Sequence, residues 1–116
     1  MSTRVLKINS EIQKAVSEIF QQDIHNPNIN GLISVVRVDT SADLSVSKIF
    51  LSIYGATSTQ DVFNEILHSA GYIRKELCHK LNLRKVPFLQ FMLDTSYEYG
   101  SKIDKLIEKM NEERGN

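Results

Sequence analysis

The sequence predicts a two-layer α+β domain in which helices pack on one face of a three-stranded sheet. Apolar residues recur with helical spacing in two long segments, and three short segments are rich in β-branched or alternating apolar residues. The predicted order is helix, strand, strand, interrupted helix, strand, helix. At 116 residues, of which 41% are hydrophobic, the chain has the usual size and composition of one globular domain. We therefore expect residues 1–116 to form a single domain.

The first element is an amphipathic helix, because apolar residues recur at intervals of three and four over the first twenty positions. Ser2 or Thr3 can cap it, and it should end before Asn26, since the following Pro27 disfavours helical backbone there. Its predicted buried residues are Val5, Ile8, Ile12, Ala15, Val16, Ile19 and Phe20.

Two strands should follow as a hairpin. Residues 32–39 are rich in β-branched side chains, residues 40–45 have turn composition, and residues 46–54 alternate apolar and polar positions. Asp39 and Asp43 flank the turn and are expected to serve it.

A second helical pattern begins after Ser58, a capping residue, and one apolar stripe continues for about twenty positions. The stripe consists of Val62, Phe63, Ile66, Leu67, Ala70, Ile73, Leu77 and Leu81. Gly71 lies inside it, although an interior glycine costs a helix about 1 kcal/mol relative to alanine. The sequence therefore predicts a kink or a close helix crossing at Gly71, with alanine there lowering stability.

The third strand is expected at residues 86–93, with Pro87 near its start, where proline is best tolerated. Ser96 can then cap a last helix over residues 96–113. One face of that helix carries Ile103, Leu106, Ile107 and Met110.

The charge distribution indicates a local basic patch in a chain of zero net charge. Between positions 67 and 93 there are five basic residues and one acidic residue, Glu76, a local balance of +4. The basic residues are Arg74, Lys75, Lys80, Arg84 and Lys85. Such a patch can attract phosphate, although a charged helix face is more often merely solvated. On the same helical pattern, one face opposite the apolar stripe carries His68, Tyr72, Lys75, His79 and Asn82. A cationic face with one aromatic ring is suited to phosphate contact and base stacking.

The sequence gives little support for a catalytic cysteine, a metal site or a membrane segment. Cys78 is expected to be a buried structural cysteine, because neighbouring positions in a helix point about 100° apart and Cys78 cannot converge with His79 on one atom. The histidines lack the paired spacing of a zinc site, so we predict no metal. The start of the chain has no secretory signal, no apolar run reaches a membrane span, and one cysteine fits a reducing compartment; a cytoplasmic location is expected.

Three runs of sequence resemble one family. They are Ser69-Ala70-Gly71-Tyr72-Ile73-Arg74, Arg84-Lys85-Val86-Pro87-Phe88-Leu89-Gln90-Phe91 and Asp94-Thr95-Ser96. They resemble the ribosome-binding factor A family, a type II KH-like fold in which an A-x-G kink replaces the G-x-x-G loop. Arg4-Val5, Asp43-Leu44 and Tyr99-Gly100 also fit, so the likeness covers roughly residues 2–110. One departure is Ser69, which stands where the family has alanine.

This resemblance implies a ribosome assembly factor that binds the 30S subunit or its precursor through 16S rRNA. It further implies a role in late maturation of the small subunit, including growth in the cold. It also implies no enzymatic activity and no cofactor. We further expect no small-molecule substrate, no membrane as a partner, and a monomer. The candidate RNA-binding residues are Arg74, Lys75, Lys80, Arg84, Lys85, Tyr72, His79, Arg4 and Lys7, with Ser69, Ala70 and Gly71 as the kink.

Several alternatives stay open from sequence. Arg84 can contact phosphate or pair with Asp94. The domain can instead be a small-molecule-binding regulatory module, since helices over a small sheet also serve that purpose. A small acid–base enzyme using His68 or His79 is a third possibility, with Tyr72 and Lys75 as the only second groups on that face.

Overall fold

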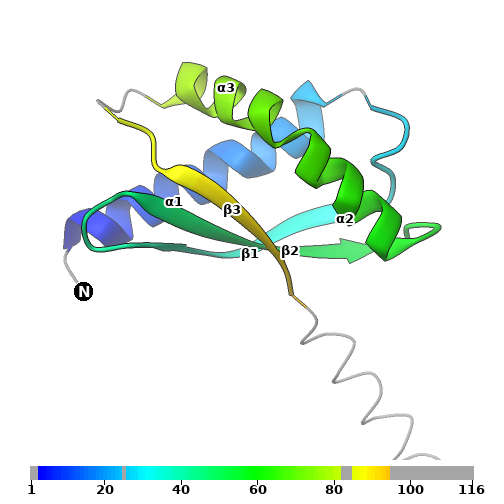
Figure 1. Cartoon of the computed structure of the whole chain (residues 1–116), viewed down its shortest axis with the longest axis horizontal. Helices are drawn as coiled ribbons and strands as arrows, with labels where there is room; N and C mark the ends of the chain where they lie inside the picture. The colour runs from blue at the N-terminus through cyan, green and yellow to red at the C-terminus, as the bar shows by residue number, and fades with distance from the viewer. Residues whose placement is uncertain (1–2, 25, 82–84, 95–116) are drawn as a thin grey trace, which may run out of the picture.

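The computed structural model describes residues 3–24, 26–81 and 85–94. Its elements are α1 (Thr3–Glu18), the π-helical turn η1 (Ile19–Asp23), β1 (Leu32–Thr40), β2 (Val46–Tyr54), α2 (Thr59–His68), α3 (Ala70–Lys80) and β3 (Phe88–Leu93). The helices lie on one side of the sheet (Figure 1). The predicted α+β class and the predicted order through β3 are confirmed. The expected helix at 96–113 lies outside the described residues.

The sheet has the order β1-β2-β3, with β1 antiparallel to β2 and β2 parallel to β3. The parallel pair runs from Val46 opposite Phe88 to Leu51 opposite Leu93. Parallel neighbours need a long crossover, and α2 with α3 supplies it. This crossover places both helices over the same face that α1 covers.

A bulge in β1 changes which side chains point to the helices. The pairing with β2 shifts between Val35 and Arg37, so Val36 and Arg37 are both exposed while Val35 and Val38 are both buried. The extra residue in β1 reverses which positions face inward, so that inward and outward side chains alternate again after the bulge. Arg37 is thereby directed onto the outer face of the sheet, where its guanidinium lies 4.1 Å from the centre of the Phe50 ring.

The core lies between the helices and the inner face of the sheet. It joins the first helical stripe, the second helical stripe and the inward positions of all three strands. Its fully buried members include Ile12, Val16, Ile19, Ile49, Leu51, Ile66, Ile73 and Leu77. The buried hydroxyls of Thr40 and Ser47, on neighbouring strands, bond each other at 2.8 Å, which satisfies two polar groups that burial would otherwise penalise.

Side-chain hydrogen bonds organise the turn between β1 and β2. Asp43 Oδ1 accepts from the hydroxyls of Ser41 and Ser45, both at 2.7 Å, and from the Ser45 amide at 3.1 Å. These hydrogen bonds, the Ser45 hydroxyl first, lower the pKa of Asp43 from 3.8 to about 2. Leu44 takes the left-handed conformation, with φ of 63°. The prediction that Asp43 serves the turn is confirmed, whereas Asp39 forms an ion pair with Arg37 at 3.3 Å.

The second helical pattern does break, but the break is at Ser69. Ser58 caps α2 as expected, its Oγ accepting from the Asp61 amide. Ser69, with φ of −90° and ψ of 4°, ends α2 and begins α3. Gly71 lies one residue inside α3, without positive φ, and a Cβ added there would meet nothing within 4 Å. The predicted tight crossing or strained backbone at Gly71 is wrong, because that position faces open space.

The approach to β3 also differs slightly from expectation. The strand begins at Phe88, so buried Pro87 precedes the ladder rather than entering it. Proline has no amide to donate, and the ladder starts where the Phe88 amide donates to the Ser45 carbonyl. Pairing continues at the other end, where the Asp94 amide donates to the Leu51 carbonyl.

Candidate nucleic-acid interface

Helix α3 carries the centre of the predicted surface. Ile73 and Leu77 are fully buried and fix the helix against the core, so the positions around them point outward. Tyr72, Lys75 and His79 are all exposed. Their spacing of three and four residues places them on one face of the helix, as the sequence predicted. A ring, a cation and an imidazole are thus presented together to solvent.

His68 does not continue this face along a single helix. The break at Ser69 assigns it to the end of α2, where its Nδ1 lies 3.9 Å from Glu65 Oε2. Asn82, which the sequence placed on the same face, lies outside the described residues. The cationic face is therefore a property of α3 alone.

Arg74 has a structural contact that sequence reasoning missed. Its Nη2 donates a hydrogen bond of 2.9 Å to the carbonyl of buried Val86, which leads into β3. The bond ties the middle of α3 to the chain just before Pro87. Arg74 therefore positions the start of β3, and its charge remains near the surface because the residue is exposed.

Lys80 is also engaged within the molecule. Its Nζ lies 3.7 Å from Glu18 Oε2, and the pair joins the ends of α3 and α1. A shallow cleft beside it is lined by Glu11, Lys14 and Glu18 from α1. Positive and negative charges are mixed at this end, so it offers phosphate less attraction than the middle of α3.

Lys75 and Lys85 are the two candidate lysines best placed to meet phosphate. Both are exposed, and neither forms an ion pair with any residue that the structure describes. Lys85 lies immediately before the buried Val86-Pro87 step that leads into β3. Arg84 lies outside the described residues, so its choice between phosphate and Asp94 stays a prediction.

Arg4 and Lys7 are exposed on the first two turns of α1. It is the other end of α1, at Glu18, that contacts α3. At 1.5 Å per residue, Arg4 and Lys7 lie about 21 and 16 Å along the helix from Glu18. The contact between α1 and α3 at Glu18 therefore does not place Arg4 and Lys7 beside Lys75.

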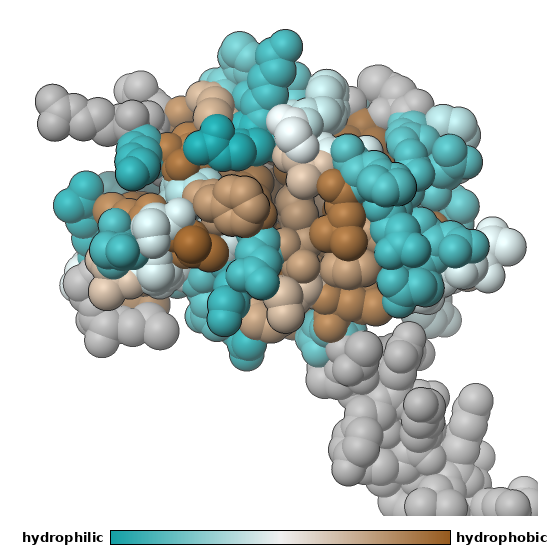
Figure 2. Space-filling view, viewed as in Figure 1, coloured by the Kyte–Doolittle hydropathy of each residue, from teal (hydrophilic) through white to brown (hydrophobic). Residues whose placement is uncertain are grey.

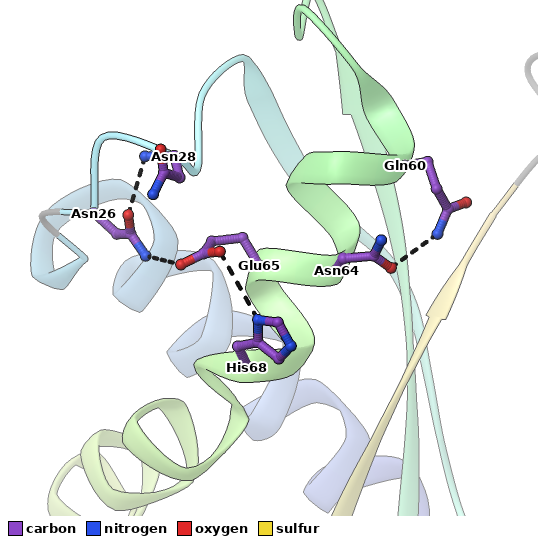
Figure 3. A network of polar contacts seen from close by, with 6 residues as sticks. All are labelled: Asn26, Asn28, Gln60, Asn64, Glu65 and His68. Carbon is purple, nitrogen blue, oxygen red and sulfur yellow. Dashed lines mark hydrogen bonds and ion pairs between the residues drawn. The ribbon is translucent and has the colours of Figure 1, made fainter.

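A polar network closes the α2 side of the site (Figure 3). Asn26 Nδ2 donates to Glu65 Oε1 at 2.8 Å, and Asn26 Oδ1 accepts from the Asn28 amide at 3.0 Å. The network ties the loop after η1 to α2 and holds Glu65 beside His68. This carboxylate adds negative charge next to the helix break, which favours an anionic ligand on α3 over one at α2.

Cys78 is exposed, so the prediction of a buried structural cysteine is wrong. Leu77 fills the core position, and the next residue in a helix is turned about 100° away from it. Among the described residues there is no group of three His, Cys, Asp or Glu side chains able to hold a metal ion. Within the same ranges, no helix has both the length and the apolar character needed to cross a bilayer.

The order of elements, the helix pair broken at Ser69 and the parallel β2–β3 pair define a type II KH-like domain. The family model described as ribosome-binding factor A matches residues 4–107. Ribosome-binding factor A of Clostridium novyi is 37% identical over 114 residues, covering 97% of this chain and 94% of that protein. The Clostridium acetobutylicum protein of the same name is 41% identical over 108 residues, with 92% and 89% covered. The chain belongs to the ribosome-binding factor A family.

Solved structures give the same fold. The crystal structure of ribosome-binding factor A from Thermus thermophilus matches with a TM-score of 0.68 and 18% identity, covering 77% of this chain and 93% of that one. A homology model of the Thermus thermophilus factor, fitted into a cryo-electron microscopy map of its complex with the 30S subunit, matches with a TM-score of 0.63. It is also 18% identical and covers 75% of this chain and 91% of the other.

Proposed function

We propose that this chain binds the 30S ribosomal subunit, or its precursor, by contacting 16S rRNA with the exposed face of α3. It acts there as an assembly factor in late maturation of the small subunit, including growth in the cold, as a cytoplasmic monomer. Family membership supports ribosome binding, and the fitted complex of the Thermus thermophilus relative supports the 30S subunit as the target. Maturation of 16S rRNA and action in the cold rest on the family alone.

One observation carries the location of the interface. Tyr72, Lys75 and His79 are exposed on one face of α3, while Ile73 and Leu77 bury the opposite face. Cationic side chains satisfy phosphate, and an aromatic ring can stack on an unpaired base. Lys85 extends the positive charge toward β3. Arg74 and Lys80 contribute charge to this surface while holding Val86 and Glu18.

The proposed action is binding without catalysis and without a cofactor. RNA recognition by such a domain needs a rigid surface of fixed shape and charge, and the buried side of α3 provides that rigidity. The competing functions are a regulatory ligand-binding module and an acid–base enzyme. Both predict a protein that does not bind ribosomes.

Sedimentation tests the proposal. The protein, in a lysate at low salt, should migrate with small ribosomal subunits and should move to the top fractions as salt is raised, because phosphate contacts release counterions. Free migration at low salt, with intact 30S subunits present in the same gradient, would contradict ribosome binding. That result would favour the regulatory or enzymatic alternatives.

A further inference from the structure

Arg74 joins two parts of the chain that both carry candidate RNA-binding residues. From α3, its Nη2 donates a hydrogen bond of 2.9 Å to the carbonyl of Val86, twelve positions further along and just before β3. In the space-filling view, hydrophilic side chains gather at the top of the molecule, where α3 lies (Figure 2). The bond therefore fastens the segment that leads into β3 to this hydrophilic helix.

The segment before β3 is held from two directions. Val86 is 7% exposed and Pro87 is fully buried, so this step of the chain is anchored in the interior. The Phe88 amide then donates to the Ser45 carbonyl at 2.9 Å, which starts the pairing with β2. Pro87 has no amide to donate, so the bond from Arg74 supplies a polar contact that fixes the backbone ahead of the strand.

The position of Lys85 depends on this anchor. Lys85 directly precedes Val86, and a trans peptide sets their two Cα atoms about 3.8 Å apart. The lysine is exposed and forms no ion pair with the residues that the structure describes. Its ammonium group can therefore accept an anionic partner. Fixing the backbone that carries the lysine lowers the entropy lost when the side chain binds.

An arginine is suited to holding this carbonyl while keeping its charge at the surface. A guanidinium presents five N–H donors in a planar fork and stays ionised. The Val86 carbonyl uses one of these donors, and Arg74 is exposed, so its positive charge stays accessible to solvent. Positive charge from α3 and from the segment before β3 is thereby gathered around one carbonyl group.

We propose that Arg74 is a positioning residue for RNA binding, whose bond to Val86 holds Lys85 where this lysine meets a backbone phosphate. This role rests on the proposed function, since it assigns a phosphate contact to Lys85. Helix α3 and the segment before β3 then act as one rigid binding surface. Loss of the Arg74 bond weakens binding through a displaced Lys85 as well as through the lost charge.

A double-variant cycle on affinity for purified 30S subunits tests this coupling. Lys85→Gln should reduce the slope of log affinity against log salt by about 0.7 to 0.9 in the parent, and by less than half as much in the Arg74→Gln background. The affinity losses of Arg74→Gln and Lys85→Gln should combine to less than their product, by a factor of at least about three. Affinities are compared at a temperature where circular dichroism shows every variant folded.

The matched control is the cycle of Lys75→Gln with Lys85→Gln. Lys75 is adjacent to Arg74 on α3 and carries the same charge, but no hydrogen bond or ion pair within the described ranges ties its side chain to the segment before β3. The losses from Lys75→Gln and Lys85→Gln should therefore multiply to within about twofold.

A measurement on the free protein tests the positioning role without the ribosome. The NMR order parameter of the Lys85 amide should be above about 0.8 in the parent and in Lys75→Gln, and below about 0.6 in Arg74→Gln. An unchanged order parameter, or losses in the Arg74 and Lys85 cycle that simply multiply, would overturn the positioning role and leave ribosome binding intact. A parent protein that does not bind 30S subunits would instead overturn the proposed function, and the positioning role with it.

Discussion

At the scale of single residues, adjacent Arg74 and Lys75 of the basic segment differ in their contacts within the molecule. Its guanidinium holds the carbonyl of Val86, whereas the neighbouring Lys75 has no ion-pair partner among the described residues. Two adjacent cations of the same helix thus have different contacts. The charge count of the sequence cannot distinguish them, because the difference lies in a contact between residues far apart in the chain.

Arg74→Gln should lower the free energy of unfolding by about 1 kcal/mol, because the Val86 carbonyl loses a hydrogen bond from a charged donor. Lys75→Gln, the matched control, should change it by less than about 0.5 kcal/mol, as is usual for exposed surface positions. Urea denaturation of the parent and both variants measures the two differences. Equal midpoints for the two variants would show that the Arg74 contact adds nothing to stability.

Gly71→Ala should raise the free energy of unfolding by roughly 0.5 to 1 kcal/mol, reversing the expectation from sequence. Alanine restricts the unfolded chain and favours helix, and the added Cβ would meet nothing within 4 Å. Chemical denaturation decides the sign. A lower midpoint for the alanine variant would mean that the helix pair is closer at this position than the structure has it.

The errors at Gly71 and Cys78 have the same origin. Both expectations are based on the residue type and not on its position around the helix. Glycine is expected at a tight crossing and cysteine in the core. Cys78 lies beside the buried stripe of Ile73 and Leu77 and not within it, because adjacent helical positions diverge by about 100°. For Gly71 the sequence carries no such signal, because the break depends on the backbone of Ser69 and on how α3 packs.

At the scale of elements, the β1–β2 turn couples stability to acidity through Asp43. The pKa of this carboxyl is lowered to about 2 in the folded protein from 3.8, so the folded state favours the ionised form. The stabilisation is complete above about pH 4 and is lost as the pH falls through 2. We expect the folded protein to lose stability over this interval more steeply than the variant Asp43→Asn.

The direct measurement is an NMR titration of the Asp43 side chain, with denaturation of both proteins between about pH 2 and 5. Titration of Asp43 at its ordinary pKa, near 3.8, would contradict the hydrogen-bonded turn.

Element positions are largely predictable from the sequence, and the reason is periodicity. The expected bounds of the second strand, residues 46–54, are correct, and the Ser58 cap fixes the start of α2. The β1 bulge is not predictable, since an extra residue in one strand has no signature in β-branched composition. It matters because it turns Arg37 outward beside Phe50, a contact that no spacing rule suggests.

At the scale of the whole molecule, the fold presents two different sets of charged side chains on the two faces of the domain. The inner face of the sheet and the buried side of α3 form one core, which leaves Lys75 exposed on the helical side. The outer sheet face carries Arg37, which lies over Phe50 and pairs with Asp39, and Lys48, whose strand neighbours are Asp39 and Gln90. The sequence predicts the basic segment but not the pair of Arg37 and Lys48. These two residues lie on different strands, and the pairing register that places them on one face is not evident from the sequence.

The central claim, that 16S rRNA is contacted by the α3 face, is tested most directly by the salt dependence of affinity for purified 30S subunits. Lys75→Gln/Lys85→Gln should reduce the slope of log affinity against log salt by about 1.4 to 1.8, if each lysine neutralises one phosphate. Arg37→Gln/Lys48→Gln removes the same charge from the opposite face and should keep the parent's slope, with thermal melts confirming that both variants fold. A slope lowered only by Arg37→Gln/Lys48→Gln would place the RNA on the sheet, and a slope lowered equally by both double variants would show no preference for the α3 face. Either result would contradict the account.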